Sequence, residues 1–184
     1  MKKIIENFFD LGLIRQNRYE LEEVGKILKD RPPLRHVLEI GAKFGGSLLY
    51  YSQFFHPEAT VIAIDPVPAF KVKEAIQRSI KELHLIHGKS QTLNTKLTVV
   101  KILKDNFLDF LHIDGSHTYE DVKHDFYSYS VFINENTMVV IHDISEESGV
   151  KRFWNELKII FPDSCFTEII DVEGHAGIGV ITSC

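Results

Sequence analysis

The feature that most constrains the fold is a pair of apolar segments, VLEIGAKFGGS (37–47) and VIAIDP (61–66). The first predicts a buried strand that runs into a glycine-rich turn and a returning helix, and the second predicts a strand that ends at Asp65. Asp65 lies 24 residues after Gly41. A βαβ unit of roughly 30 residues places a ribose-binding carboxylate at about this point. The two segments therefore predict a pocket that accepts an adenosine.

The glycine turn also limits which adenosine cofactor can bind. A dinucleotide fingerprint, GxGxxG, needs glycine at position 43, where the backbone touches the pyrophosphate, and this chain has Lys43. A phosphate-binding loop, GxxxxGK, needs lysine after its second glycine, but Gly46 is followed by Ser47. The remaining pattern is ExGxxxGG, with Glu39 at the end of the strand. It favours a cofactor that carries an amino acid instead of phosphates, and we expect S-adenosylmethionine.

Strand-like and helix-like segments alternate along the chain, which is typical of a parallel sheet covered by helices. Helices are expected at 19–29, 45–55, 70–82, 90–103, 118–131 and 147–160, and strands at 36–41, 60–65, 83–88, 107–113, 137–142, 165–171 and 177–183. The last two strands are joined by residues 172–176 alone, too few for a crossover helix, so they should pair antiparallel. We predict one α/β domain over residues 1–184. It is a Rossmann-like, doubly wound, seven-stranded and mostly parallel sheet with a C-terminal antiparallel hairpin, and residues 1–18 form an N-terminal helical extension.

Composition excludes several other classes of protein. The 184 residues, 44% of them hydrophobic, are enough for one domain with a buried core. A formal charge of -5 gives no electrostatic reason to expect a nucleic acid as partner. No segment approaches the roughly 18 apolar residues of a membrane span, and Cys165 and Cys184 are too few for a disulfide framework or a zinc cluster. We expect a soluble, cytoplasmic protein that binds a small-molecule substrate, but neither nucleic acid nor membrane, and we leave a homo-oligomer open.

Four predicted strands end in polar residues at the edge where parallel sheets bind their ligands. The four ends are Glu39-Ile40-Gly41, Asp65, Asp114-Gly115 and His142-Asp143. A single aspartate at a strand end often only caps a helix or forms a turn. Four such ends on one edge indicate a converging site.

The last two ends supply candidate metal ligands and a candidate base. Asp114, His142 and Asp143 offer oxygen and nitrogen ligands to a divalent ion, and His117 lies three residues after Asp114 on the same rim. His117 could instead cap the helix that follows it. Ser90 could contact adenine or cap the helix that begins there.

Three further polar residues have simpler interpretations. We expect Asp125 to be solvated or bonded to a neighbouring loop, His112 to be a packing residue and His124 to lie on the surface.

Several segments together resemble a known family. They are VLEIGAKFGGSLLY, IHGKS, DFLHIDGSHTYEDVKHDFYSY, VVIHDI, SGVKRFWNELK and GIGVI. Over about residues 20–184 the chain resembles the class I S-adenosylmethionine-dependent methyltransferases. It is most similar to the small-molecule branch that includes macrolide-sugar O-methyltransferases and cephalosporin hydroxylase-like proteins.

The resemblance implies a seven-stranded sheet with a reversed final hairpin, a cofactor at Gly41, Gly45 and Asp65, and a metal at Asp114, His142 and Asp143. In the sugar enzymes the histidine three residues after the metal-binding aspartate is the general base, and His117 has that position here. We therefore expect Asp114 and His117 to be catalytic. The full set of expected cofactor-binding residues is Glu39, Gly41, Ala42, Gly45, Ser47, Asp65, Ser90 and Asp114.

Two departures from the family pattern bear on this expectation. Lys89 stands where the family commonly has an acid after the third strand, so the adenine contact is in doubt. His142 replaces a carboxylate, and imidazole suits Mn, Fe or Zn better than Mg, so the identity and the presence of the metal stay open.

The activity expected is transfer of a methyl group to a hydroxyl of a small molecule, with a divalent metal such as Mg or Mn as a second cofactor. The main alternative is a non-catalytic S-adenosylmethionine-binding module. Lys43 argues against a nicotinamide oxidoreductase, and the alternating chain does not resemble the all-β scaffold of an iron-dependent oxygenase.

Overall fold

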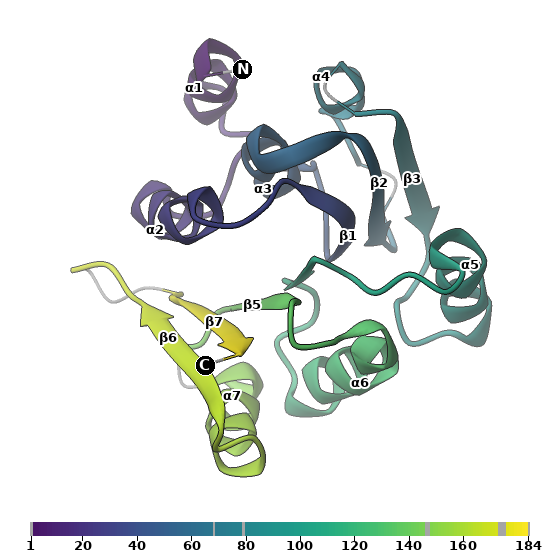
Figure 1. Cartoon of the computed structure of the whole chain (residues 1–184). Helices are drawn as coiled ribbons and strands as arrows, with labels where there is room; N and C mark the ends of the chain where they lie inside the picture. The colour runs from purple at the N-terminus through teal and green to yellow at the C-terminus, as the bar shows by residue number, and fades with distance from the viewer. Residues whose placement is uncertain (1, 68, 79, 146–147, 173–175, 184) are drawn as a thin grey trace.

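The structure is a computed structural model that describes residues 2–67, 69–78, 80–145, 148–172 and 176–183. Its centre is a seven-stranded sheet with the strand order β3-β2-β1-β4-β5-β7-β6 (Figure 1). The strands are β1 (Leu34–Ile40), β2 (Phe55–Asp65), β3 (Glu82–His87), β4 (Phe110–Ile113), β5 (Met138–His142), β6 (Ser164–Ile169) and β7 (Ile178–Ser183). The helices are α1 (Lys2–Asp10), α2 (Arg18–Lys29), α3 (Gly46–Tyr51), η1 (Ser52–Phe54), α4 (Lys73–Gln77), α5 (Leu93–Leu103), α6 (Tyr119–Tyr129), η2 (Ser130–Phe132) and α7 (Gly149–Ile160).

The predicted fold class is confirmed. Strands β1 to β5 pair parallel, whereas β7 pairs antiparallel with both β5 and β6. The expected elements also included residues 1, 79, 147, 173–175 and 184, which lie outside the described part of the chain. The reversal of sheet order between β1 and β4 opens a crevice at the carboxyl ends of these strands, and this is where parallel sheets bind ligands.

Three expected helices differ from the observed ones. The helix predicted over 45–55 ends at Tyr51, and residues 55–59 belong to a long β2 instead. The helix predicted over 70–82 is only five residues long, and no side chain caps its first turn. The helix predicted from residue 90 starts at Leu93, because Thr92 is its N-cap and accepts a hydrogen bond from the Thr95 amide.

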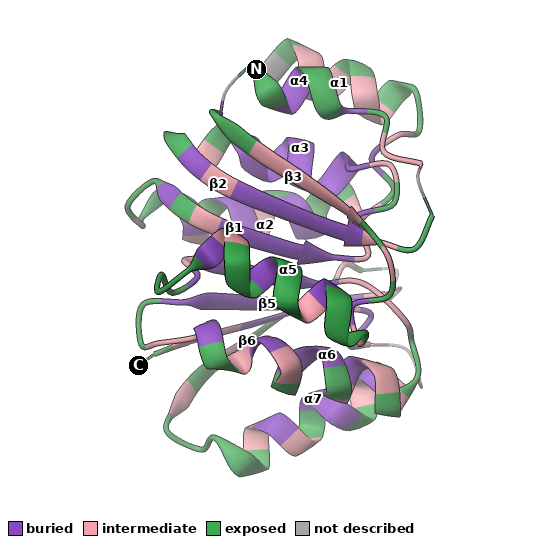
Figure 2. Cartoon of the chain, turned by 90° about the vertical axis from the view of Figure 1, so that its right-hand side faces the viewer, coloured by how far each residue is buried: buried purple, intermediate pink, exposed green. Residues whose placement is uncertain are grey.

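Helices cover both faces of the sheet, and the strands alternate between the two apolar layers. Along β1, Val37 packs into the layer under α2 and α3, and Leu38 packs into the layer under α5, α6 and α7. Figure 2 shows the inner strands β1, β2 and β5 buried along most of their length, the edge strand β3 only partly buried, and the helices exposed on their outer sides. Trp154 on α7 is 1% exposed. This packing fixes the strand ends that carry the site.

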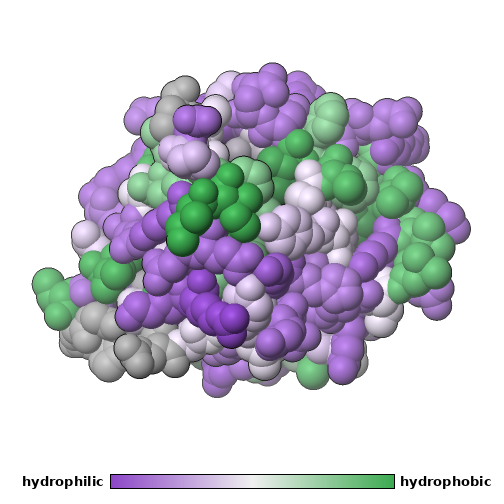
Figure 3. All heavy atoms as spheres, turned by 90° about the horizontal axis from the view of Figure 1, so that it is seen from below, coloured by the Kyte–Doolittle hydropathy of each residue, from purple (hydrophilic) through white to green (hydrophobic). Residues whose placement is uncertain are grey.

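Among the described residues, no helix is both long enough and apolar enough to span a membrane bilayer. The face seen in Figure 3 is mostly hydrophilic, with separate hydrophobic patches. Cys165 on β6 is disulfide-bonded. The expected cytoplasmic location stays a prediction.

Candidate active site

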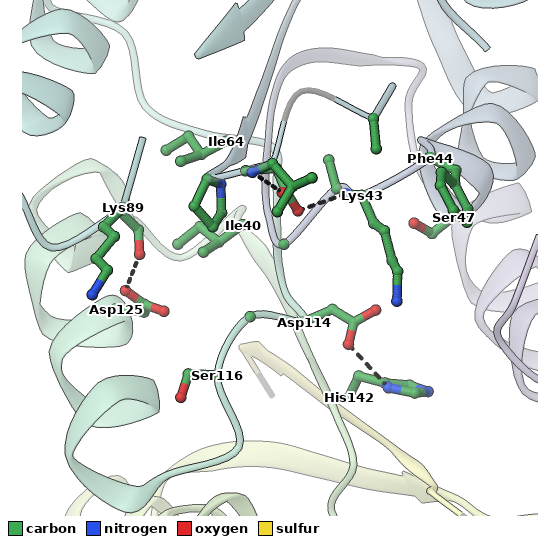
Figure 4. A pocket seen from close by; sticks show the side chains of 18 of the residues that line it. Ile40, Lys43, Phe44, Ser47, Ile64, Lys89, Asp114, Ser116, Asp125 and His142 are labelled. Carbon is green, nitrogen blue, oxygen red and sulfur yellow. Dashed lines mark hydrogen bonds and ion pairs between the residues drawn. The ribbon is translucent and has the colours of Figure 1, made fainter. Parts of the chain in front are cut away.

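A cavity of about 750 Å³ lies at the carboxyl ends of β1, β2, β4 and β5. The glycine turn, Asp65, the segment after β3, Asp114 and the end of β5 all contribute to its wall. Figure 4 shows Ile40 and Ile64 on one side of this space and the facing pair of Asp114 and His142 on the other. The strand ends that the sequence placed together thus surround one cavity.

The glycines of the turn are required by packing within the chain itself. Gly41 has φ of +87°, and a Cβ atom there would lie 1.9 Å from the carbonyl oxygen of Asp114. Gly45 has φ of +83° and is closely covered by Phe70 and Val72. Only glycine readily combines such a backbone with so close an approach. The turn therefore brings the ends of β1 and β4 into contact beside the cavity, although Gly45 itself does not line it.

Glu39 lies beneath the cavity and does not line it. Its side chain is fully buried, accepts a hydrogen bond from the Ser47 hydroxyl, and lies 2.7 Å from Nδ1 of His112. His112 is the cross-strand neighbour of Glu39 in the parallel pair of β1 and β4, and its ring packs edge-on against Tyr51. Any contribution of Glu39 to cofactor binding is therefore indirect, through Ser47, which does line the cavity with Ala42.

Asp65 ties two loops of the cavity together. One of its carboxylate oxygens accepts a hydrogen bond from the backbone amide of Lys43 at 2.8 Å, and the other accepts from the amide of Val67 at 2.7 Å. Each carboxylate oxygen has a second lone pair, and Asp65 lines the cavity. The side chain is thus held in place and can still accept hydrogen bonds from ribose hydroxyls.

Ser90 and Asp125 form a buried pair at another part of the cavity wall. The Ser90 hydroxyl donates to Asp125 at 2.6 Å, and the Gln91 amide donates to the same oxygen at 2.8 Å. Ser90 is therefore not a helix cap. Of the two interpretations of Asp125, solvated or bonded to a neighbouring loop, the structure confirms the second. The other oxygen of Asp125 has no hydrogen-bond partner among the described residues. Burial raises the pKa of Asp125 to about 6, although the hydrogen bonds from Ser90 and Gln91 act in the opposite direction.

The ends of β4 and β5 bring four predicted residues together. Nδ1 of His142 lies 3.2 Å from Asp114 and 3.3 Å from Asp143, and Nε2 of His117 lies 3.1 Å from Asp143. The His117 side chain is 59% exposed, whereas those of the other three are at most 14% exposed. His117 does not cap α6, because Thr118 is the N-cap and accepts from the Asp121 amide. The cluster is a buried floor of carboxylates and imidazole with one exposed histidine at its edge.

Two residues of this cluster were missed by the sequence analysis. Gln16 donates a hydrogen bond to Asp114 at 2.6 Å, and the fully buried Glu20 lies 3.7 Å from Nε2 of His142 while it accepts from the Gly177 amide. The sequence pattern could have indicated that Glu20 is buried, because Glu20 lies on the same buried stripe of α2 as Leu21. No pattern pointed to Gln16, since it lies in the segment before that helix.

The charges within the cluster support one another. Burial alone would lower the pKa of His142, but its contacts with the carboxylates of Asp114, Asp143 and Glu20 outweigh burial and raise this pKa to about 12. Burial alone would raise the pKa of Asp114, but His142, His112 and Gln16 together outweigh it, so this pKa falls below its usual value. His142 is thus a buried cation that neutralises the surrounding carboxylates.

Two of the three expected metal ligands lie close together, and His117 lies with them. The described residues that present ligand atoms within 4.8 Å of one another are Asp114, His117 and Asp143. Nδ1 of His142, the third expected ligand, lies 3.2 Å from Asp114 and 3.3 Å from Asp143, and its role as a ligand stays a prediction. Two carboxylates and one imidazole nevertheless form a donor set that suits a divalent ion.

Backbone strain occurs at two lining residues. Asp143 has φ of +64° and Lys43 has φ of +44°, in a backbone region that residues other than glycine seldom adopt. At Asp143 this conformation turns the chain at the end of β5 and leaves its carboxylate beside His117. Lys104 and Ala176, away from the cavity wall, share the feature, so strain alone does not mark the site.

A comparison with known protein families identifies this arrangement. The sequence model of a family described as a methyltransferase domain matches residues 38–144, which run from β1 to just past β5. The chain belongs to the methyltransferase domain family. The expectation of a class I S-adenosylmethionine-dependent methyltransferase is thereby confirmed, and the matched region of this methyltransferase domain contains the glycine turn, Asp65, His117 and the ends of β4 and β5.

Solved structures with the same fold are similar over nearly the whole chain. One is the O-methyltransferase TomG of Streptomyces achromogenes, involved in tomaymycin synthesis and solved with S-adenosylmethionine. It has 16% identity and a TM-score of 0.67, covering 97% of this chain and 86% of TomG. A candidate caffeoyl-CoA O-methyltransferase of Staphylococcus aureus has 15% identity and a TM-score of 0.72, covering 98% and 92%. An O-methyltransferase of Bacillus cereus, solved with S-adenosylhomocysteine, has 15% identity and a TM-score of 0.60, covering 98% and 97%.

A curated relative adds little about activity. Protein y4gI of Sinorhizobium fredii, itself uncharacterised, is 36% identical over 67 residues. That match covers 35% of this methyltransferase domain and only 7% of the length of the relative.

Proposed function

We propose that this methyltransferase transfers the methyl group of S-adenosylmethionine to a hydroxyl of a small-molecule acceptor. The observation that carries the proposal is the position of His117 at the edge of the cavity that also contains Asp65, with its Nε2 atom 3.1 Å from Asp143. A cofactor bound by its ribose at Asp65 and an acceptor beside His117 would share one space. The O-methyltransferases TomG and that of Bacillus cereus, solved with the cofactor or its product, have the same fold.

The acidic floor suits the charge of the cofactor. S-adenosylmethionine carries a positive sulfonium and an ammonium group, and Asp65, Asp114 and Asp143 lie around the cavity. In the transfer, the bond between methyl carbon and sulfur breaks as the bond to the acceptor oxygen forms, and the oxygen loses its proton. Holding donor and acceptor in line contributes up to roughly 7 to 11 kcal/mol in favourable cases.

His117 is the residue placed to take that proton. Its contact with Asp143 favours the tautomer that carries hydrogen on Nε2, and this leaves Nδ1 as the proton acceptor. Its exposed side chain can reach an acceptor that enters from solvent, and Asp143 would stabilise the resulting imidazolium. Asp114 fixes the floor on the cofactor side through its contacts with His142 and Gln16.

A divalent ion such as Mg or Mn fits as a second cofactor at this site. Asp114 and Asp143 would hold it, and His117 could be its third donor only in place of its role as the base. Such an ion would lower the pKa of a hydroxyl bound to it.

The first test is ligand binding. S-adenosylmethionine and S-adenosylhomocysteine should raise the melting temperature, whereas NAD and ATP should not. Ligand at 100 times its dissociation constant adds about 2.7 kcal/mol of stability. Asp65→Ala should remove most of the shift, and Asp109→Ala, which removes a strand-end carboxylate away from the cavity, should retain it. Equal stabilisation by NAD would refute the proposed cofactor.

The second test is single-turnover methyl transfer with metal content measured on the same samples. His117→Ala should retain cofactor binding and lose on the order of 10² to 10⁴ in rate, the usual contribution of a positioned base. His124→Ala is the matched control, because His124 is exposed on the helix that follows His117 and contacts Lys96 instead. Full activity in His117→Ala would remove the base from the mechanism. Cofactor binding without transfer to any acceptor would leave a non-catalytic binding module.

A further inference from the structure

Three cationic side chains surround one aromatic ring, that of Phe44; Arg15, Lys43 and Phe44 line the cavity, and Lys71 lies just outside its lining. The guanidinium carbon of Arg15 lies 5.6 Å from the centre of the Phe44 ring, Nζ of Lys43 lies 5.9 Å from it, and Nζ of Lys71 lies 5.0 Å from it. All three cationic residues are exposed, and none forms an ion pair with any residue that the structure describes. We name these three residues and Phe44 the cationic rim.

Contacts of the backbone hold the residues of the cationic rim in place. The Lys71 amide donates to the Phe44 carbonyl at 3.0 Å, and the Lys43 amide donates to Asp65 at 2.8 Å. Arg15 is brought in by the segment between α1 and α2, which packs closely on Gly46. Three like charges around one ring repel one another, and contact with the half-buried ring of Phe44 compensates only weakly.

The rim contrasts with the rest of the cavity and of the protein. The chain carries a net charge of -5, and the cavity floor is made of carboxylates that suit a cationic cofactor. Figure 4 shows Lys43 extending from the glycine turn into this cavity, and Phe44 beside it. A cationic rim over an acidic floor favours two ligands of opposite charge in the same space.

The positive charge also continues away from the cavity. Lys71 lines a second hollow of about 770 Å³ between α1 and α4, where Lys3, Lys73 and Arg78 also contribute to the wall. A ligand that extends from the first cavity past Phe44 would therefore meet further cations.

We infer that the methyl acceptor carries an anionic group, a phosphate ester or a carboxylate, which binds at the cationic rim while its hydroxyl reaches His117. The aromatic face of Phe44 would pack against the carbon skeleton next to that group. This inference rests on the proposed function, because it assigns the acceptor of the same site. It adds the chemical class of that acceptor.

The test uses the intact chain saturated with S-adenosylhomocysteine and pyrophosphate as the anionic probe. The triple variant Arg15→Met, Lys43→Met, Lys71→Met removes the charges of the rim. The control variant Lys29→Met, Lys101→Met, Lys104→Met removes the same number of exposed charges elsewhere. Calorimetry at low salt should show pyrophosphate binding weakened at least tenfold in the rim variant and less than threefold in the control. Equal loss in both variants, or in neither, would overturn the inference.

An acceptor panel then separates the two anionic groups. Catechol is paired with 3,4-dihydroxybenzoate, and glucose with glucose 6-phosphate, and kcat/KM is compared within each pair. Preference for the anionic member of a pair, lost in the rim variant and kept in the control, identifies the group. Equal use of both members by the wild type would refute the inference. The affinity for S-adenosylhomocysteine, measured on every sample, tests the proposed function separately: its absence would refute that function whatever the pyrophosphate result.

Discussion

Asp125→Asn should change how the stability of this protein depends on pH. The Asp125 side chain is 1% exposed, one of its oxygens accepts hydrogen bonds from Ser90 and Gln91, and the other has no partner among the described residues. An uncharged asparagine can keep the accepting oxygen and does not ionise. The substitution therefore isolates the free-energy cost of a buried carboxylate charge.

The magnitude follows from the raised pKa. Folding moves the pKa of Asp125 from 3.8 to about 6, so the folded state binds more protons than the unfolded state between these values. The free energy of unfolding of the wild type therefore falls as pH rises through this window. A difference of about two pKa units corresponds to about 3 kcal/mol. The asparagine variant lacks this loss, so its stability relative to the wild type should rise by up to about 3 kcal/mol between pH 4 and pH 7.5.

Urea unfolding of both proteins at pH 4.0, 5.0, 6.0 and 7.5 measures this change. The amide hydrogens that the substitution introduces cost a constant amount, so the change with pH is the quantity compared. Asp121→Asn is the control with the opposite sign, because hydrogen bonds from Ser116 and Thr118 lower the pKa of Asp121. That variant should be less stable than the wild type at pH 7.5, and the difference should shrink as pH falls. A stability difference for Asp125→Asn that does not vary with pH would refute the reasoning.

The remaining predictions concern packing. Trp154→Ala should lower the free energy of unfolding by roughly 3 to 5 kcal/mol in a denaturant titration, because the ring is buried; unchanged stability would mean that it is not. Gly41→Ala should prevent folding or cofactor binding, since its Cβ would lie 1.9 Å from the Asp114 carbonyl oxygen. Gly12→Ala, with similar φ and open space, should cost far less in thermal unfolding. Gly46→Ala should displace the segment before α2 and speed its limited proteolysis, and unchanged cleavage would contradict this contact.

The parts of the fold that the sequence predicted depend on local patterns. Apolar runs such as 61–64 identify buried strands, and a connection too short for a helix identified the final hairpin. Both kinds of information lie within about ten consecutive residues. The length of β2 could not be predicted in this way, because residues 55–59 contain Pro57 and no continuous apolar run, and they extend the strand through pairing and packing with the rest of the sheet.

The site was predicted to the level of strand ends but not to the level of ligand atoms. Parallel strands must end on one edge, so the sequence could place Asp114, His142 and Asp143 together. Which nitrogen faces which oxygen depends on rotamers and on Glu20, a residue from α2 that the prediction did not include. Glu20 helps to make His142 a cation, and His117 is the third residue whose ligand atom lies close to those of Asp114 and Asp143. The roles of these residues, the presence of a metal and a homo-oligomeric state stay predictions.

The remaining wall of the cavity comes from outside the part of the chain that the family shares. The family match covers residues 38–144, whereas Leu13, Arg15 and Gln16 come from the segment that the sequence assigned to an N-terminal extension. A residue on this segment contacts Asp114 on the floor, and another contributes a charge to the rim. The shared region contains the glycine turn, His117 and three of the four residues of the cationic rim, and the segment before α2 adds Arg15 to the rim and Gln16 beside Asp114. Acceptor recognition, as proposed, therefore depends on both the shared region and this segment.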